Sequence, residues 1–365
     1  MDTTQDQLAR RIRMARERSG LTQAQLSEKL GFKDRQTLSA IESGQRKVSA
    51  EELVRFLKVL EVDFEFLTDP FILIGEPRFS WRAKVAPAAL DAFEEKVRPV
   101  VGMYRQLSRD LGLTTPTLIP QLPLDTSSRF DDAAAAAEKL SAEWGLGDRP
   151  AQRLIQTVEE KLSMRVLMLD MPPEVSVAAL ALPDLPVILV NRQESGGRRN
   201  YDFAHELFHI LTWRAMPPPE MDTVNPTGYK AKRVEQLAES FAPALLMPEQ
   251  LMRRLASIRP DNVEMHEWIL TASGVLSVSG QAFYQRLKHL GLVRDGDGWM
   301  EPEKLARPDD EPKPKLYSRR FMERMHASIV RGNVSVRRMA RALDLTIDDL
   351  ADLFRDHGLE PPFGL

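Results

Sequence analysis

Two histidines and a glutamate at positions 205, 206 and 209 have the types and the spacing for metal-assisted hydrolysis. They stand in the run His205-Glu206-Leu207-Phe208-His209. Residues four apart lie on one face of an α-helix, so both imidazoles can reach one metal ion. Glu206 lies about 100° round the helix from His205, where it can accept a proton from water beside the metal. The run predicts a zinc site with His205 and His209 as ligands and Glu206 as the catalytic base.

A third ligand is expected, because catalytic zinc usually takes three protein ligands and keeps its fourth position for water. The chain has no cysteine, and its other four histidines are scattered. A carboxylate is therefore the natural candidate. Glu235 and Glu239 lie one turn apart in the helix-like segment 233–247, and either could complete the site. The other could then hydrogen-bond a ligating imidazole.

The motif needs a helix to carry it and a sheet to support that helix. Apolar residues surround the motif between 203 and 211, and Asn200 or Asp202 can cap the helix at its start. Upstream, the segments 175–182 and 187–191 are β-like and predict a hairpin through Pro183-Asp184-Leu185-Pro186. An apolar helix beside a sheet is a suitable support for a closed zinc site.

The first fifty residues have the pattern of a DNA-binding module. They carry ten Lys/Arg and six Asp/Glu, although the whole chain has a net charge of −3. A first amphipathic helix stops at Gly20, and Thr22 is the expected N-cap of a second helix that ends at Gly31. Asp34 caps a third helix, and Ser49 begins a fourth. Two short helices joined by a tight turn form a helix-turn-helix, whose second helix enters the major groove of DNA.

Composition narrows the class of protein further. The chain has 365 residues, of which 43% are hydrophobic and 28% are charged, so two or three ordinary domains are expected. The lack of cysteine excludes disulfides, catalytic thiols and cysteine-built metal sites. No segment approaches the ~20 apolar residues of a membrane span, and the first residues lack the apolar core of a secretory signal. A cytoplasmic protein is the expectation.

The C-terminal region has an uneven charge distribution. Residues 307–315 are charged and proline-rich, which predicts a linker. Residues 313–341 carry nine Lys/Arg and one Glu, whereas residues 342–365 carry six Asp/Glu and one Arg. Two short helices are expected there, with Thr346 as a cap. The region is either a surface for nucleic acid or a partner, or a solvated helical cap whose halves attract each other, and the second interpretation is favoured.

The segment 21–49, LTQAQLSEKLGFKDRQTLSAIESGQRKVS, resembles the Xre/Cro-type helix-turn-helix family. The resemblance implies binding to an operator in double-stranded DNA, and such modules commonly pair as homodimers on two-fold sites. An interaction module that has lost DNA binding is the alternative. By the geometry of the family, the DNA contacts would come from Gln23, Arg35, Gln36, Thr37, Ser39, Arg46 and Lys47, the last two on phosphate.

The segments NYDFAHELFHILTW and EQLAESFAPALLMP are similar to the ImmA/IrrE-type metallopeptidases. The resemblance implies that Glu235 is the third zinc ligand and that Glu239, where the family usually has Asn or Asp, orients a ligand. It also implies that PVILVN, residues 186–191, is an edge strand that could hold an extended peptide by β-addition. Tyr201, Tyr229 and His266 are candidates to assist the oxyanion, and a packed or surface-exposed role is the favoured alternative for each.

The resulting fold prediction is α+β and mainly α. It comprises a DNA-binding domain at 1–68, a helical connecting region at 69–150, a zincin-like peptidase domain with a small sheet at 151–306, and a helical tail at 316–365. The predicted function is a transcriptional regulator with a zinc metallopeptidase domain. By resemblance it would cleave a helix-turn-helix repressor in a stress or mobile-element response. The fusion of both domains in one chain adds two options, namely cutting itself within 68–150 or sensing without cutting.

The alternative function is a non-catalytic DNA-binding regulator, or the antitoxin of a toxin–antitoxin pair, with zinc in a structural role. The presence of Glu206 argues against this alternative, because a structural site needs no base.

Overall fold

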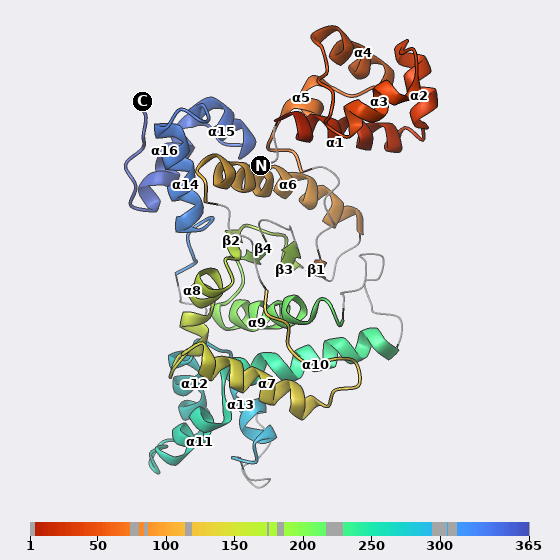
Figure 1. Ribbon diagram of the computed structural model, residues 1–365. Coiled ribbons are helices and arrows are strands. Elements are labelled where there is room, and N and C mark those ends of the chain that lie inside the picture. Colours follow the sequence, from red (N-terminus) through yellow and green to blue (C-terminus); the bar gives the residue numbers. More distant parts are fainter. Residues whose placement is uncertain are drawn as a thin grey trace.

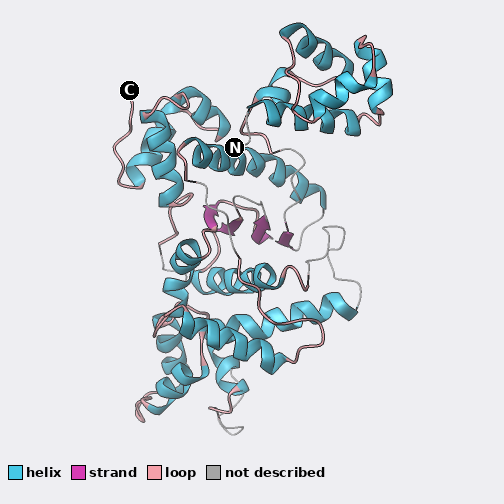
Figure 2. Cartoon of the chain, in the orientation of Figure 1, coloured by secondary structure: helices cyan, strands magenta, loops and turns pink. Residues whose placement is uncertain are grey.

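The computed structural model describes residues 4–73, 80–83, 87–113, 119–173, 175–180, 186–216, 229–293, 305 and 312–364. The chain is mainly helical, with one small β-sheet near the middle of the molecule (Figures 1 and 2). The predicted α+β, mainly α fold is therefore confirmed. Within the described residues, no helix combines the length and apolar character that crossing a membrane requires.

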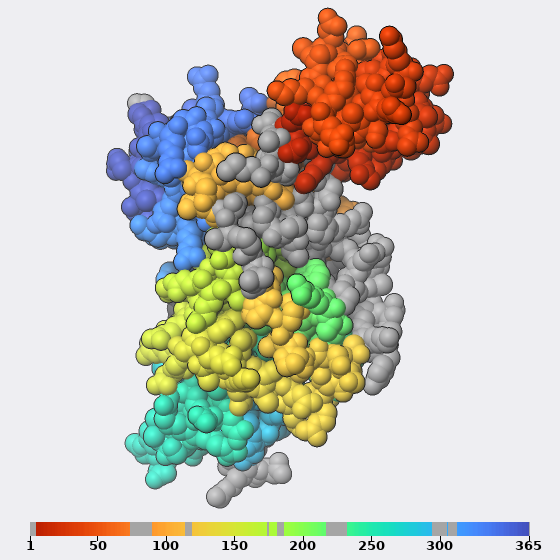
Figure 3. Space-filling model, viewed as in Figure 1, coloured from red at the N-terminus to blue at the C-terminus, as the bar shows by residue number. Residues whose placement is uncertain are grey.

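Five helices at the N-terminus form a compact unit with its own core. Ile12, Leu26, Leu38 and Phe56 meet in that core and are fully buried. The unit lies at one end of the molecule, next to the C-terminal helices (Figures 1 and 3). Its helices are α1 (Thr4–Arg18), α2 (Gln23–Leu30), α3 (Arg35–Glu42), α4 (Ala50–Leu60) and α5 (Phe64–Thr68).

Local capping sets the ends of these helices, as the sequence predicts. The Thr22 and Ser49 side chains each accept a hydrogen bond from the backbone three residues later, and each forms a capping box. Asp34 accepts one from the backbone N–H of Thr37 at 2.8 Å. Gly31 ends α2 with a φ of 72°, a left-handed conformation that glycine adopts without steric cost.

The sheet contains the strands β1 (Ser80–Ala83), β2 (Arg165–Leu169), β3 (Val175–Leu180) and β4 (Val187–Asn191). Their order is β1-β3-β4-β2, and β3 pairs antiparallel with both β1 and β4. The predicted pairing of the segments that contain β3 and β4 is confirmed. The predicted turn between them lies mostly outside the described residues, because residues 181–185 are not described.

The prediction that PVILVN forms an edge strand was wrong. β4 pairs on its second side with β2, in parallel, from Arg165↔Val187 to Leu169↔Asn191. Both sides of the β4 backbone are therefore used within the sheet, and the strand cannot add a peptide. The pairing with β2 joins segments about twenty residues apart and was not read from the sequence.

Helices cover both faces of the sheet. Side chains of one parity, such as Val177 and Ile188, belong to a large core shared with α9 (Gly196–Thr212). Side chains of the other parity, such as Ala178 and Leu189, pack in a second core with α6 (Pro87–Asp110). Beyond α9 lie α7 (Phe130–Glu143) and α10 (Tyr229–Leu246), which pack on each other (Figure 1). The remaining helices on this side are α8 (Pro150–Lys161), α11 (Glu249–Ser257), α12 (Met265–Val275) and α13 (Gly280–His289).

The C-terminal region completes the second core. Phe321, Met325 and Phe354 are fully buried there and share the cluster with α6 and the sheet. Thr346 caps the last helix, as predicted. The C-terminal region therefore covers one face of the sheet through α6. Its helices are α14 (Arg319–Val330), α15 (Val336–Ala342) and α16 (Ile347–Asp356).

Basic residues of α15 face the N-terminal unit. Arg338 pairs with Asp69 at 2.8 Å, and Arg341 pairs with Glu65 at 3.4 Å. Arg338 also lies 4.8 Å from the centre of the Phe71 ring. Arg338 and Arg341 therefore pair with acidic residues at the end of the N-terminal unit, and not with the acidic residues 342–365 as the sequence suggested.

Candidate metal centre

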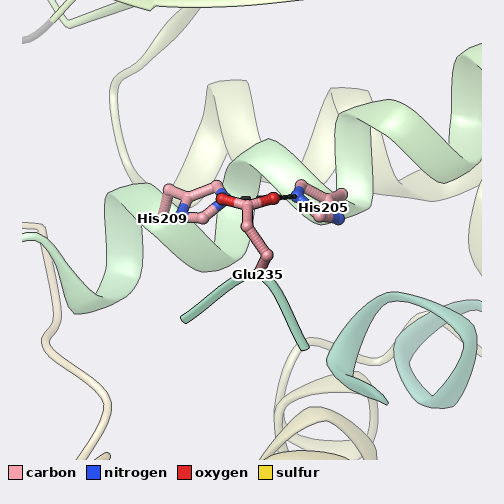
Figure 4. Close-up of side chains that lie close together, drawn as sticks. All are labelled: His205, His209 and Glu235. Atoms are coloured by element: carbon pink, nitrogen blue, oxygen red, sulfur yellow. Dashed lines mark hydrogen bonds and ion pairs between the residues drawn. The ribbon is translucent and has the colours of Figure 1, made fainter. Parts of the chain in front are cut away.

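Two helices bring three metal-binding side chains together. His205 and His209 lie one turn apart on α9, and Glu235 approaches them from α10 (Figure 4). The His205 Nε2 atom is 3.2 Å from Glu235 Oε2, and the His209 Nε2 atom is 3.4 Å from Glu235 Oε1. The two Nε2 atoms are 3.1 Å apart. Both imidazoles are almost fully buried, at 1% and 4% exposure.

The three side chains fit a zinc ion in both chemistry and spacing. Imidazole nitrogen and carboxylate oxygen are its usual ligands besides thiolate, at about 2.0 to 2.2 Å. Atoms at that distance from a tetrahedral centre lie about 3.3 Å from one another. The three separations of 3.1, 3.2 and 3.4 Å match this value. A cation would also stabilise three electron-pair donors that converge in a largely buried place.

Packing between α9 and α10 fixes the relative positions of the ligands. Ala204 and Leu207 on α9, together with Leu237 and Ala238 on α10, are fully buried in the same core. Phe208 packs against Phe241 across the two helices, with ring centres 5.4 Å apart. The ring that precedes the second histidine therefore joins the two helices.

The other predicted residues of this site lie in different surroundings. Glu206, next to His205, is buried with 3% exposure, which places a potential base within the same enclosed region. Glu239 is exposed and lines a cavity beside the site, as does the half-buried Tyr201. His266 is exposed on α12. The side chain of Tyr229 lies outside the described residues.

The predicted DNA contacts fall into two groups. Arg35, Gln36 and Lys47 are exposed, and Thr37 and Ser39 are partly exposed on α3. Gln23 and Arg46 are used within the domain. The amide of Gln23 donates to Glu42 at 2.8 Å, and the guanidinium of Arg46 pairs with Glu52 at 2.7 Å. Neither contact was predicted from the sequence, although Glu42 and Glu52 are acidic residues of the same domain and could have suggested them.

Comparison with protein families gives two matches. A helix-turn-helix family model matches residues 12–67, and a model of the IrrE N-terminal-like domain matches residues 159–288. The chain joins a helix-turn-helix domain to an IrrE-like domain. His205, His209 and Glu235 all fall within the second match. No curated protein matches the chain. The two domains together support a regulator with a DNA-binding domain and a peptidase-like domain, and the finer domain boundaries stay a prediction.

Proposed function

We propose that this chain is a DNA-binding transcriptional regulator whose IrrE-like domain is a zinc-dependent endopeptidase. The observation that carries the proposal is the group of His205, His209 and Glu235. Their ligand atoms lie within 4.8 Å of one another, beside the buried Glu206. Two imidazoles and one carboxylate form the donor set of known catalytic zinc sites and leave a fourth position for water.

Each side chain has a role in this proposal. His205, His209 and Glu235 would hold the ion. When bound, zinc supplies Lewis acidity, which polarises a peptide carbonyl and makes water easier to deprotonate. Glu206 would accept the proton of the attacking water and return it to the leaving amine. Burial of the imidazoles keeps their orientation fixed, so ligand geometry need not be reorganised during the reaction.

The proposed substrate is a protein of the repressor type. The resemblance to ImmA/IrrE-type peptidases favours a helix-turn-helix repressor that is cut in a stress or mobile-element response. The chain itself carries such a domain, so a cut in cis within residues 68–150 is a second form of the same proposal. The proposed DNA contacts are the exposed Arg35, Gln36 and Lys47, with Thr37 and Ser39 beside them.

A co-expression experiment tests this function. Wild-type protein, Glu206→Gln and His205→Ala are each produced with candidate helix-turn-helix repressors, and zinc content and fragments are measured. We expect wild type to contain about one zinc ion per chain and to cut the repressor or itself. Glu206→Gln should retain zinc without cutting, and His205→Ala should lose both. Full biological activity in Glu206→Gln would contradict the enzyme and would favour a non-catalytic regulator with a structural zinc ion.

A further inference from the structure

A cavity of about 900 Å³ lies beside the candidate metal centre. Its walls come from α7, α9, α10 and α13, and they include Tyr201 and Glu239. Tyr201 precedes His205 by one helical turn, and Glu239 follows Glu235 by one turn. The cavity therefore begins about 5.4 Å along both helices from the ligands. An extended peptide advances about 3.3 Å per residue, so a side chain one or two residues from a bond held at the centre would reach it.

The cationic groups of the cavity wall are already paired. Arg198 pairs with Glu194 at 3.1 Å and with Asp202 at 3.6 Å. Arg286 is buried, pairs with Glu138 at 2.6 Å, and donates to the backbone oxygen of Met247. Both guanidinium groups of the wall are therefore held in ion pairs within the described structure.

Glu239 differs from these groups. It is exposed to the cavity, and within the part of the chain that the structure describes it has no hydrogen bond or ion pair. Glu239 is the one carboxylate among the described residues of the wall. Its negative charge therefore faces the cavity without an ion pair in the described part of the chain.

The rest of the wall suits a cation on an apolar stem. Phe130, Tyr201, Pro243 and Ala282 supply apolar surface around Glu239. Arginine and lysine bury their methylene stems on such surface while their charged ends reach a polar partner. The apolar surroundings also strengthen the attraction between opposite charges relative to open water.

We propose that Glu239 determines substrate specificity, by binding the side chain of an arginine or lysine that lies one or two residues from the scissile bond. This inference rests on the proposed peptidase function. It also gives Glu239 a role in place of the orienting role that the family resemblance implies, since the structure puts its carboxylate at the cavity.

Peptide binding tests the inference without hydrolysis. The full chain with Glu206→Gln is titrated with capped pentapeptides Ala-Ala-Xaa-Ala-Ala, in which Xaa is arginine, its neutral analogue citrulline, or glutamate. We expect the arginine peptide to bind about tenfold more tightly than the citrulline peptide, and the glutamate peptide to bind most weakly. Adding Glu239→Gln should reduce the ratio between arginine and citrulline to about one.

A matched control is Glu267→Gln, which removes an exposed carboxylate of α12 away from the cavity and should leave the ratio unchanged. Equal binding of arginine and citrulline peptides to the Glu206→Gln chain would overturn the inference, as would a ratio that survives Glu239→Gln. If the arginine preference holds while the wild-type chain cuts no peptide, the site stands and the peptidase function fails. If the wild-type chain cuts peptides without any preference for basic residues, the peptidase function stands and the specificity role of Glu239 fails.

Discussion

In the helix-turn-helix domain, the buried carboxylate of Glu42 accepts two hydrogen bonds from the guanidinium of Arg16, the shorter at 2.7 Å, and a third from Gln23. In the IrrE-like domain, the carboxylate of Glu235 lies 3.2 Å from His205 and 3.4 Å from His209. The first carboxylate, that of Glu42, has a positively charged partner within the domain, and by accepting hydrogen bonds from Arg16 it raises the pKa of that guanidinium. The second meets two imidazoles, which are neutral when they act as metal ligands.

The contacts of Glu42 stabilise a domain, whereas those of Glu235 belong to a candidate metal-binding site. The contacts of Glu42 join α1, α2 and α3, and they are complete without any ligand. The contacts of Glu235 join α9 and α10 through donor atoms that would all bind one cation. Losing the first arrangement should unfold a domain, whereas losing the second should remove a metal ion and its chemistry.

The largest expected effect is on hydrolysis. Glu206→Gln should lower the rate of peptide cleavage by about 10² to 10⁴, because the proton of the attacking water loses its acceptor. Zinc content and operator binding should stay at wild-type levels. Cleavage is followed by mass spectrometry and zinc by elemental analysis. A variant that loses zinc along with activity would show that Glu206 supports the site instead of acting as the base.

The next effect is on folding of the N-terminal domain. Glu42→Ala should cost about 3 kcal/mol, because it removes the buried carboxylate that pairs with Arg16 and leaves that guanidinium only the exposed Glu17 as an acidic partner. Hydrogen exchange in residues 4–68 should rise, while exchange in α9 and zinc content should not change. Arg13→Ala, which removes an exposed pair with Glu17 and leaves Arg16 untouched, is the control and should cost less than about 1 kcal/mol. Equal costs for the two variants would contradict the assigned role of Glu42.

The salt dependence of DNA affinity should differ between variants of Lys47 and of Arg46. Lys47 is exposed, so Lys47→Ala should reduce the slope of log affinity against log salt by about one. Arg46 is paired with Glu52, so Arg46→Ala should act mainly through domain stability and leave the slope nearly unchanged. Fluorescence anisotropy at several salt concentrations measures both slopes. An equal drop for Arg46→Ala would mean that this side chain leaves Glu52 to contact phosphate.

The smallest expected effect is on the contact between the N-terminal unit and α15. Arg338→Ala removes an ion pair with Asp69 that is partly exposed, so it should weaken this contact by at most about 1 kcal/mol. Hydrogen exchange in residues 64–73 should rise slightly, more at low salt than at high salt. Arg331→Ala, at an exposed position after α14, is the control. Unchanged hydrogen exchange in residues 64–73 at both salt concentrations would show that Arg338 does not stabilise this contact.

Much of the local structure followed from the sequence. Thr22, Asp34 and Ser49 were identified as caps because a cap needs only its own side chain and the next three residues. The shared face of His205 and His209 followed from helical spacing alone. Glu235 was different, because the residues alone left it equal to Glu239 and only the family resemblance distinguished them.

Long-range contacts were harder to predict. The interpretation of PVILVN as an edge strand failed because β2 pairs with it from a distant segment. The C-terminal region was expected to be a solvated cap, yet Phe321 and Phe354 complete a core under the sheet. In both cases the sequence did not show which segments contact each other, because these contacts join segments that are not neighbours in the chain.

The sequence by itself determined the capped helix starts in the first domain, the spacing of the two histidines and the chemical types of the donor groups, because each depends on a few neighbouring residues. The tertiary structure decided that Glu235 meets the imidazoles while Glu239 faces a cavity, and that Gln23 and Arg46 are held inside their domain. The physical reason is that a side chain's partner depends on helix packing. One turn of α10 separates a group at the metal centre from a group at the cavity beside it.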